Sequence, residues 1–215
     1  MKDKIIEYIK RNKVSTTEVA DCLGKSGAIP NLMAVNRGHF CVGEVVWTYA
    51  LDESNWTVHR DISDIEPGCI LMIDVINCKK RAVIGELVAK YVLLYRQAQA
   101  IVVRGNIRDA GNIAKENYAI WCEGFSPVGC FNTEVKKDID DKQRNALSDK
   151  YSGAIAVCDL CGVVLIPRHM QSYEFYQDLQ NIEEQEDIWF DCIDRRKWDT
   201  FDTVCNKKYL QEGLL

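Results

Sequence analysis

Residues 69–105, "CILMIDVINCKKRAVIGELVAKYVLLYRQAQAIVVRG", decide the expected fold class. Two uninterrupted apolar runs within them, 69–73 and 100–103, are typical of strands buried on both faces. Between these runs, five apolar residues recur at helical spacing: Leu87, Val88, Tyr91, Leu94 and Tyr95. A helix from 86 to about 97 therefore joins the two strands, which predicts a parallel, right-handed β-α-β unit.

The flanking segments extend this unit in both directions. Before it, the patterns predict a short helix that begins with a Ser15–Glu18 capping box and a strand at 39–51 interrupted at Gly43. After it, they predict a helix at 110–116, a strand at 118–124 and an exposed excursion with weak strand content at 130–150. Two strands joined by a tight turn follow within 152–170, and an amphipathic helix begins at about 171. We therefore expect one mixed α/β domain, residues 1–170. A C-terminal helix and tail, residues 171–215, would pack on this domain or on a neighbouring subunit.

Composition excludes several classes of function. The chain has 27 Lys and Arg against 32 Asp and Glu, a net charge of -5, and no basic block, so we expect no direct nucleic-acid binding. No apolar run approaches the roughly 20 residues of a membrane helix, and the charged start "MKDKIIEYIKRNK" does not resemble a signal peptide. A cytoplasmic protein without membrane attachment is expected. Its ten cysteines, the close pair Cys158 and Cys161 included, are interpreted as mostly free structural thiols.

Two loops are the expected place for chemistry, because ligands bind at the carboxyl ends of parallel strands. The first loop leads into the helix at 86 and offers the backbone amides of Gly85, Glu86, Leu87 and Val88 to a carboxylate or phosphate. The second carries Arg108, whose guanidinium suits an oxyanion, and Asp109, an oxygen ligand suited to Mg²⁺ or Mn²⁺. A 2-oxo acid fits both loops if they share one crevice. The alternative is a surface ion pair with Asp109 capping a helix.

Four segments in register resemble a known family: "IGELVA" (84–89), "VVRGNIRD" (102–109), "FSPVG" (125–129) and "CDLCGVVLIPR" (158–168). This is the RraA-like family, which contains the regulator of ribonuclease activity A and the class II 4-hydroxy-4-methyl-2-oxoglutarate aldolases. The resemblance implies a single-domain α/β fold of the swivelling β/β/α type and a homotrimer or hexamer with sites between subunits. It also implies a divalent-metal-dependent (Mg²⁺ or Mn²⁺) lyase that cleaves a C–C bond of a 2-oxo acid, an aldolase or oxaloacetate decarboxylase, through a metal-stabilised pyruvate enolate.

The resemblance assigns the same residues that the strand ends indicate. The amides of residues 85–88 and Arg108 would bind the substrate, Asp109 would hold the metal, and Arg108 and Asp109 would be catalytic. The family's aldolases also take an acidic side chain from a neighbour's C-terminal region, for which this chain offers a cluster: Glu183, Glu184, Glu186 and Asp187.

Three features depart from the family pattern. Arg104 adds a cation before Gly105, Asn112 replaces an acidic residue, and "VINCKK" (75–80) replaces a glycine-rich loop. Two alternatives to the lyase therefore stay open. One is a non-catalytic regulator that binds a ribonuclease, and the other is a diverged enzyme with a more anionic substrate, for which Arg104 and the cations of residues 79–81 are the clues.

Overall fold

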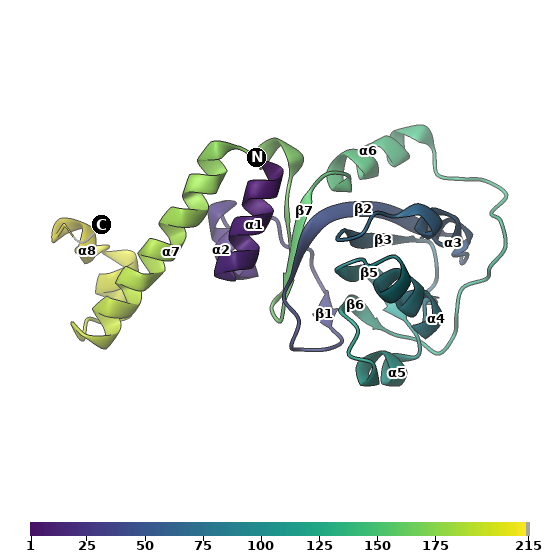
Figure 1. Ribbon diagram of the computed structural model, residues 1–215, viewed down its shortest axis with the longest axis horizontal. Coiled ribbons are helices and arrows are strands. Elements are labelled where there is room, and N and C mark those ends of the chain that lie inside the picture. Colours follow the sequence, from purple (N-terminus) through teal and green to yellow (C-terminus); the bar gives the residue numbers. More distant parts are fainter. Residues whose placement is uncertain (214–215) are drawn as a thin grey trace.

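The computed structural model describes residues 1–213 and shows a mixed α/β fold built on one sheet of eight strands (Figure 1). The strand order is β1-β6-β5-β3-β2-β7-β8, and β4 pairs with β5. The strands are β1 (Met33–Ala34), β2 (Cys41–Leu51), β3 (Ile70–Ile76), β4 (Ala82–Ile84), β5 (Ala100–Ile107), β6 (Ile120–Phe125), β7 (Ile155–Asp159) and β8 (Gly162–Ile166). The expected mixed α/β class is confirmed.

Helices cover both faces and one end of the sheet. They are α1 (Lys2–Asn12), α2 (Thr16–Cys22), α3 (Trp56–Asp61), α4 (Glu86–Lys90), α5 (Ala110–Lys115), α6 (Asp141–Tyr151), α7 (Tyr173–Asp194) and α8 (Lys208–Gln211), with single turns η1 (Ile62–Asp64), η2 (Tyr91–Tyr95), η3 (Arg168–Met170) and η4 (Phe201–Cys205). None of the helices within residues 1–213 combines the length and the apolar character needed to cross a membrane.

The central strands are buried on both faces, as their apolar runs predict. β3 pairs in parallel with β5, with Ile70 opposite Ala100. Side chains alternate along each strand, so Leu71 and Ile73 pack in one core under α3, α4 and α5. Ile70 and Met72 pack in a second core on the other face, which includes Trp121 and Tyr151. The predicted β-α-β unit is therefore present.

The helix of this unit differs from the prediction. α4 ends at Lys90 and continues as the π-helical turn η2, and the short strand β4 precedes it. Val88, Ala89 and Val92 make the buried side, whereas Leu87 is 80% exposed and Tyr95 is 70% exposed. Most of the apolar stripe read from the sequence thus faces away from this chain's core. The spacing correctly indicates a helical segment, but it identifies a face of that helix without specifying what covers it.

Two other assignments need correction. β2 runs unbroken through Gly43, where a Cβ atom would lie 2.7 Å from the carbonyl oxygen of Gly68, so this glycine permits close approach instead of ending the strand. The excursion at 130–150 contains α6, which begins where the side chain of Asp140 accepts a hydrogen bond from the amide of Gln143. The capping box of Ser15 and Glu18 is confirmed at the start of α2.

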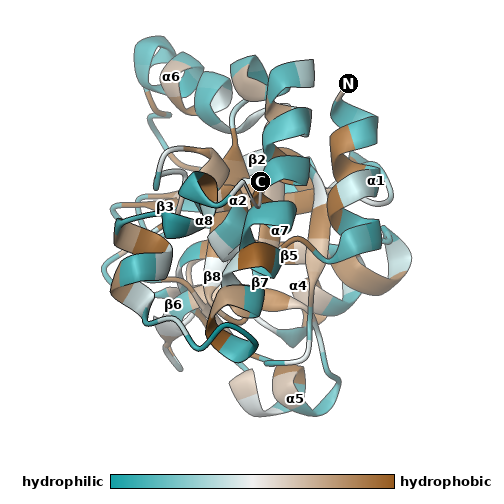
Figure 2. Cartoon of the chain, turned by 90° about the vertical axis from the view of Figure 1, so that its left-hand side faces the viewer, coloured by the Kyte–Doolittle hydropathy of each residue, from teal (hydrophilic) through white to brown (hydrophobic). Residues whose placement is uncertain are grey.

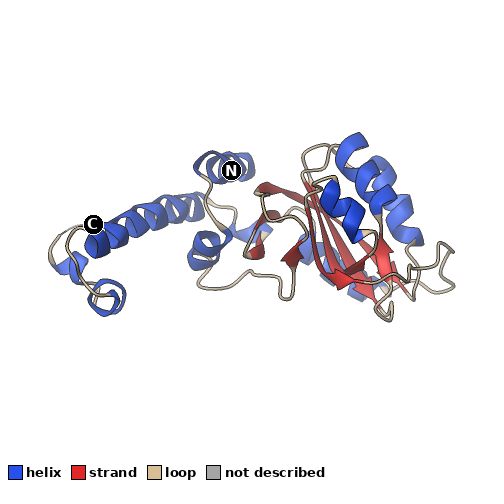
Figure 3. Ribbon diagram, turned by 90° about the horizontal axis from the view of Figure 1, so that it is seen from below, coloured by secondary structure: helices blue, strands red, loops and turns tan. Residues whose placement is uncertain are grey.

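The C-terminal segment begins as a buried helix and then leaves the body of the protein. Phe175 and Leu179 of α7 are buried with Ile5 and Ile9 of α1. In Figure 2, α1 has both hydrophobic (brown) and hydrophilic (teal) residues, as an amphipathic helix does. Beyond this contact α7 projects away from the sheet, and α8 lies near its far end (Figures 1 and 3). The division at residue 170 stays a prediction, and residues 214 and 215 lie outside the described part of the chain.

Candidate functional site

A cleft of about 150 Å³ lies where β4 and β5 end and α4 and α5 begin. A cavity of this volume is known to hold a ligand of about six heavy atoms. Its lining residues are Asn55, His59, Ala82, Val83, Ile84, Gly85, Leu87, Val88, Arg108, Asp109, Gly129, Cys130 and Asn132. The two loops that the sequence singles out therefore open onto one crevice.

Arg108 occupies a slot between two glycines. A Cβ atom on Gly85 would lie 3.0 Å from Cγ of Arg108, and one on Gly129 would lie 2.9 Å from its Nη1. The backbone amide of Arg108 donates to the carbonyl of Ile84 at 2.9 Å, which fixes the start of the loop. The side chain is 53% exposed, so its guanidinium is held in position and still accessible to a ligand.

Asp109 does not cap its own helix. It precedes α5 with φ 58° and ψ 30°, a left-handed conformation that few residues other than glycine adopt but that aspartate tolerates, and its side chain makes no capping hydrogen bond. Instead, its Oδ2 accepts a hydrogen bond from the backbone amide of Glu86 at 3.1 Å. The Nε of Arg108 is 3.8 Å from the same oxygen, beyond hydrogen-bond distance. The carboxylate thus joins the starts of α4 and α5 at the cleft.

Glu86 has a different role from the one expected. Its amide is already used by Asp109, and its side chain accepts a hydrogen bond from Asn112 at 2.7 Å. The amides of Leu87 and Val88 have no hydrogen-bond partner within residues 1–213, and both residues line the cleft. The amide of Gly85 is likewise without a partner within residues 1–213, so three of the four predicted amides at 85–88 are free, and Gly85 also leaves space beside Arg108.

Two cleft residues were missed by the sequence analysis as site residues. Asn55 is 6% exposed, and its Nδ2 donates to the carbonyl of Val83 at 2.8 Å, while its Oδ1 has no partner in the described chain. His59 is one turn later on α3, and partial burial of its ring lowers its pKa. The spacing of these two polar residues, four apart at a helix start, was the available signal.

The donor set of the cleft fits a weakly ligated hard cation. In residues 1–213 no three His, Cys, Asp or Glu side chains converge on one point. Asp109 supplies one carboxylate that is 43% exposed, and its Oδ1 has no partner among the described residues. Mg²⁺ often binds proteins through one or two carboxylates and otherwise keeps its waters. Asp109 is therefore able to hold such an ion.

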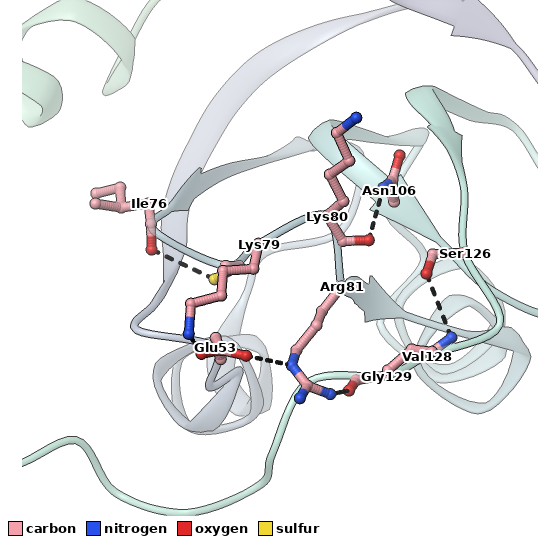
Figure 4. Close-up of polar contacts among 10 residues, drawn as sticks. Glu53, Ile76, Lys79, Lys80, Arg81, Asn106, Ser126, Val128 and Gly129 are labelled. Atoms are coloured by element: carbon pink, nitrogen blue, oxygen red, sulfur yellow. Dashed lines mark hydrogen bonds and ion pairs between the residues drawn. The ribbon is translucent and has the colours of Figure 1, made fainter.

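Of the three cations at 79–81, two are already paired, whereas Lys80 has no ion pair within residues 1–213 and does not line the candidate cleft. Figure 4 shows Lys79 and Arg81 bound to Glu53, at 2.5 Å and 2.6 Å, and these hydrogen bonds lower the pKa of Glu53. Arg104 lies in a separate cleft, where it binds the buried Asp74 at 2.8 Å and the hydroxyl group of Tyr151. The expectation that Arg104 adds charge to the crevice is wrong, because Arg104 does not line that cleft and its guanidinium is bound to Asp74.

Comparisons with known proteins agree on the fold. The family model described as RraA-like, Aldolase/RraA, matches residues 16–165. An uncharacterized protein from Pseudomonas syringae pv. tomato str. DC3000 superposes with a TM-score of 0.73 at 18% identity, over 95% of this chain and 94% of its own.

Two proteins described as RraA or as members of the RraA family are also similar in structure. Streptomyces coelicolor RraAS2, an unusual member of the RNase ES inhibitor RraA protein family, gives a TM-score of 0.66 at 20% identity, over 86% of this chain and 96% of its own. The RNA-processing inhibitor RraA from Thermus thermophilis gives 0.54 at 19%, over 71% and 92%. No curated protein sequence matches significantly. These structural likenesses concern the fold alone and confirm the expected RraA type.

Proposed function

Since the chain belongs to the RraA-like family, which includes aldolase or decarboxylase enzymes and ribonuclease regulators, we propose that it is a divalent-metal-dependent lyase acting on a small 2-oxo acid. One observation carries this proposal. The free amides of Leu87 and Val88, the guanidinium of Arg108 and the carboxylate of Asp109 meet in a single small cleft.

Each of these groups has a distinct task. The amides of Leu87 and Val88 bind the carboxylate of the substrate, because they are unpaired donors at the start of a helix. Arg108 donates to the keto oxygen and stabilises the negative charge that develops there when the neighbouring C–C bond breaks. Asp109 would hold Mg²⁺ or Mn²⁺, and the bound ion would supply Lewis-acid polarisation of the keto group.

Asn55 refines the choice of substrate. Its Oδ1 is an acceptor without a partner, and a buried unpaired polar atom costs about 1–3 kcal/mol. This oxygen is shielded from solvent, so a substrate hydroxyl group would remove that cost by donating to it after a small movement of the side chain toward the cleft. This favours a 4-hydroxy-2-oxo acid over an unsubstituted 2-oxo acid.

The exposed apolar face beside the cleft supports a multimer. Leu87, Leu94 and Tyr95 are 80%, 55% and 70% exposed, and Leu87 lines the cleft itself. Contiguous apolar surface of this kind is typical of protein contacts. We infer that a neighbouring subunit covers this face in a homotrimer or hexamer. Leu94→Asp should then reduce the molar mass measured by light scattering, whereas Glu123→Lys, an exposed charge change on β6, should leave it unaltered.

The same face favours a second candidate function, protein binding without catalysis. In that case Leu87, Leu94 and Tyr95 would contact another protein, such as a ribonuclease. By contrast, a more anionic substrate loses its main support, since Arg104 is bound to Asp74 outside the cleft.

Pyruvate release tests the lyase. The purified protein is given oxaloacetate or 4-hydroxy-4-methyl-2-oxoglutarate with Mg²⁺, with Mn²⁺ and with EDTA. We expect turnover that needs the metal, faster with the hydroxylated substrate. Turnover that survives EDTA contradicts the role of Asp109. If neither substrate reacts and pyruvate with Mg²⁺ does not raise Tm, the lyase is wrong and the binding function is favoured.

A further inference from the structure

Two free thiols lie in the wall between the candidate cleft and the cleft that contains Arg104. Cys78, in the loop between β3 and β4, lines the second cleft. Cys130, in the segment after β6, lines the candidate cleft. The Sγ of Cys78 donates to the carbonyl of Ile76 at 3.3 Å. Both thiols pack with the same core, Ala82 after the Cys78 loop pairs with Gly129 beside Cys130, and each thiol shifts the pKa of the other. The two thiols are therefore adjacent, although 52 positions separate them in the sequence.

The backbone around this thiol pair is held in register. The amide of Ala82 donates to the carbonyl of Val128 at 2.8 Å, and the amide of Cys130 donates back to the carbonyl of Ala82 at 2.9 Å. Arg81 binds the carbonyl of Gly129 at 3.0 Å while Glu53 holds its Nε (Figure 4). These contacts keep the two segments together without help from the sulfur atoms.

The pair also differs from the other thiols in its chemistry. The hydrogen bond from Cys130 lowers the pKa of Cys78, and the same contact raises the pKa of Cys130. Burial is the largest cause that raises the pKa of the core thiols Cys41 and Cys122, each to about 11. Because the thiolate is the reactive form, Cys78 is the better nucleophile of the pair.

We propose that Cys78 and Cys130 form an oxidation site that hydroperoxides convert into an intramolecular disulfide. The thiolate of Cys78 attacks one oxygen of the hydroperoxide, the O–O bond breaks, and the leaving oxygen takes the proton that the thiol has lost, which gives a sulfenic acid and an alcohol or water. The sulfur of Cys130 then attacks the sulfenic sulfur, the S–O bond breaks and water leaves with the proton of Cys130. The thiols lose two electrons and the hydroperoxide gains them.

This disulfide would alter the candidate cleft. Cys130 follows Gly129, whose Cα faces the guanidinium of Arg108 closely enough that an added Cβ would lie 2.9 Å from Nη1. Drawing Cys130 toward Cys78 moves this wall, so the slot around Arg108 changes shape. Oxidation should therefore weaken ligand binding in the cleft, and a thiol reductant should restore it.

Hydrogen peroxide, followed by alkylation and non-reducing peptide mapping, tests the proposal. We expect a linked peptide pair containing Cys78 and Cys130, which is absent in Cys78→Ser and in Cys130→Ser and present in Cys161→Ser, a control at an exposed thiol. Dithiothreitol should release the pair. The readout needs no substrate, so it is independent of the lyase assay.

Two outcomes would overturn the proposal. One is complete alkylation of both thiols after peroxide treatment that already oxidises Cys161 or Cys205. The other is a linkage that joins Cys78 or Cys130 to a different cysteine. Circular dichroism of each serine variant shows whether it is folded, and the wild-type linkage alone decides the matter if one is not.

Discussion

Two arginine–aspartate pairs at the end of β5 differ in almost every property except composition. Arg104 and Asp74 are 2.8 Å apart with side chains 30% and 5% exposed, and Trp47 and Tyr151 complete the contacts. Arg108 and Asp109 are 3.8 Å apart with side chains 53% and 43% exposed. Both carboxylate oxygens of Asp74 are bonded in the first pair, to Arg104 and to Trp47, so this pair is structural, although the Nε of Arg104 is buried without a partner in the described chain. The second retains unused donors and acceptors that face a cleft, so it is the pair suited to bind a ligand.

The sharpest way to break this comparison is Asp109→Asn. Asparagine keeps the shape, tolerates the left-handed backbone and still accepts from the amide of Glu86, but it loses the charge that holds a metal. We expect pyruvate release to fall about 10³-fold, equivalent to about 4 kcal/mol, with an unfolding free energy within about 0.5 kcal/mol of wild type. Unaltered turnover would contradict the assignment. Asp64→Asn, at a fully exposed carboxylate, is the matched control.

Asp74→Asn should give the opposite result. The variant leaves the partly buried Arg104 without a counter-charge, which should lower the free energy of unfolding by about 3 kcal/mol, at the low end of the range for broken buried pairs. Urea denaturation of both asparagine variants measures the contrast. If the two lose equal stability, the distinction between a structural and a ligand-binding pair is wrong.

Gly85→Ala tests whether the open pair depends on empty space. The new Cβ would lie 2.3 Å from Oδ2 of Asp109, so the carboxylate or the loop must shift. A displacement of about 1 Å should reduce turnover about 10²-fold. Gly111→Ala is the control in α5, because a Cβ there meets no atom within 4 Å. Equal activity of the two alanine variants would show that the close approach is unimportant.

The smallest expected effect concerns His59. Burial lowers its folded pKa, so the folded state keeps a neutral imidazole at a pH where the unfolded chain, with an ordinary pKa of about 6.5, binds a proton. This part of the stability is fully present above the unfolded pKa and is lost as pH falls toward the folded pKa. Urea midpoints below pH 6.5 should thus fall more steeply for wild type than for His59→Gln. If the urea midpoints of the two proteins depend equally on pH, the contribution of His59 to stability is excluded.

The sequence predicted the meeting of the two loops because parallel strands place their carboxyl ends together, whatever the details of the connections. It also predicted the buried strands, whose apolar runs admit few other structures. Asn55 and His59 were missed because they enter the cleft from α3, which is far from both strand ends in the chain. Only packing reveals that contact.

The sequence analysis also failed to predict which arginine lies in the candidate cleft. Arg104 and Arg108 look alike in sequence, yet Arg104 lies within β5 whereas Arg108 follows its last residue, Ile107, and the two line separate clefts. The spacing of Leu87, Leu94 and Tyr95 indicated a helix but not the exposure of its apolar face, since the sequence of one chain does not specify what a neighbouring subunit covers.

The glycines on either side of Arg108 have an evolutionary consequence. The guanidinium of Arg108 fits because neither glycine has a side chain. Substitution of either glycine would therefore displace the Arg108 side chain although Arg108 itself is unchanged. Relatives that abandon catalysis could therefore retain Arg108 and Asp109 in their alignments while losing Gly85 or Gly129. The two glycines, more than the charged residues, would then distinguish catalytically active relatives from inactive ones.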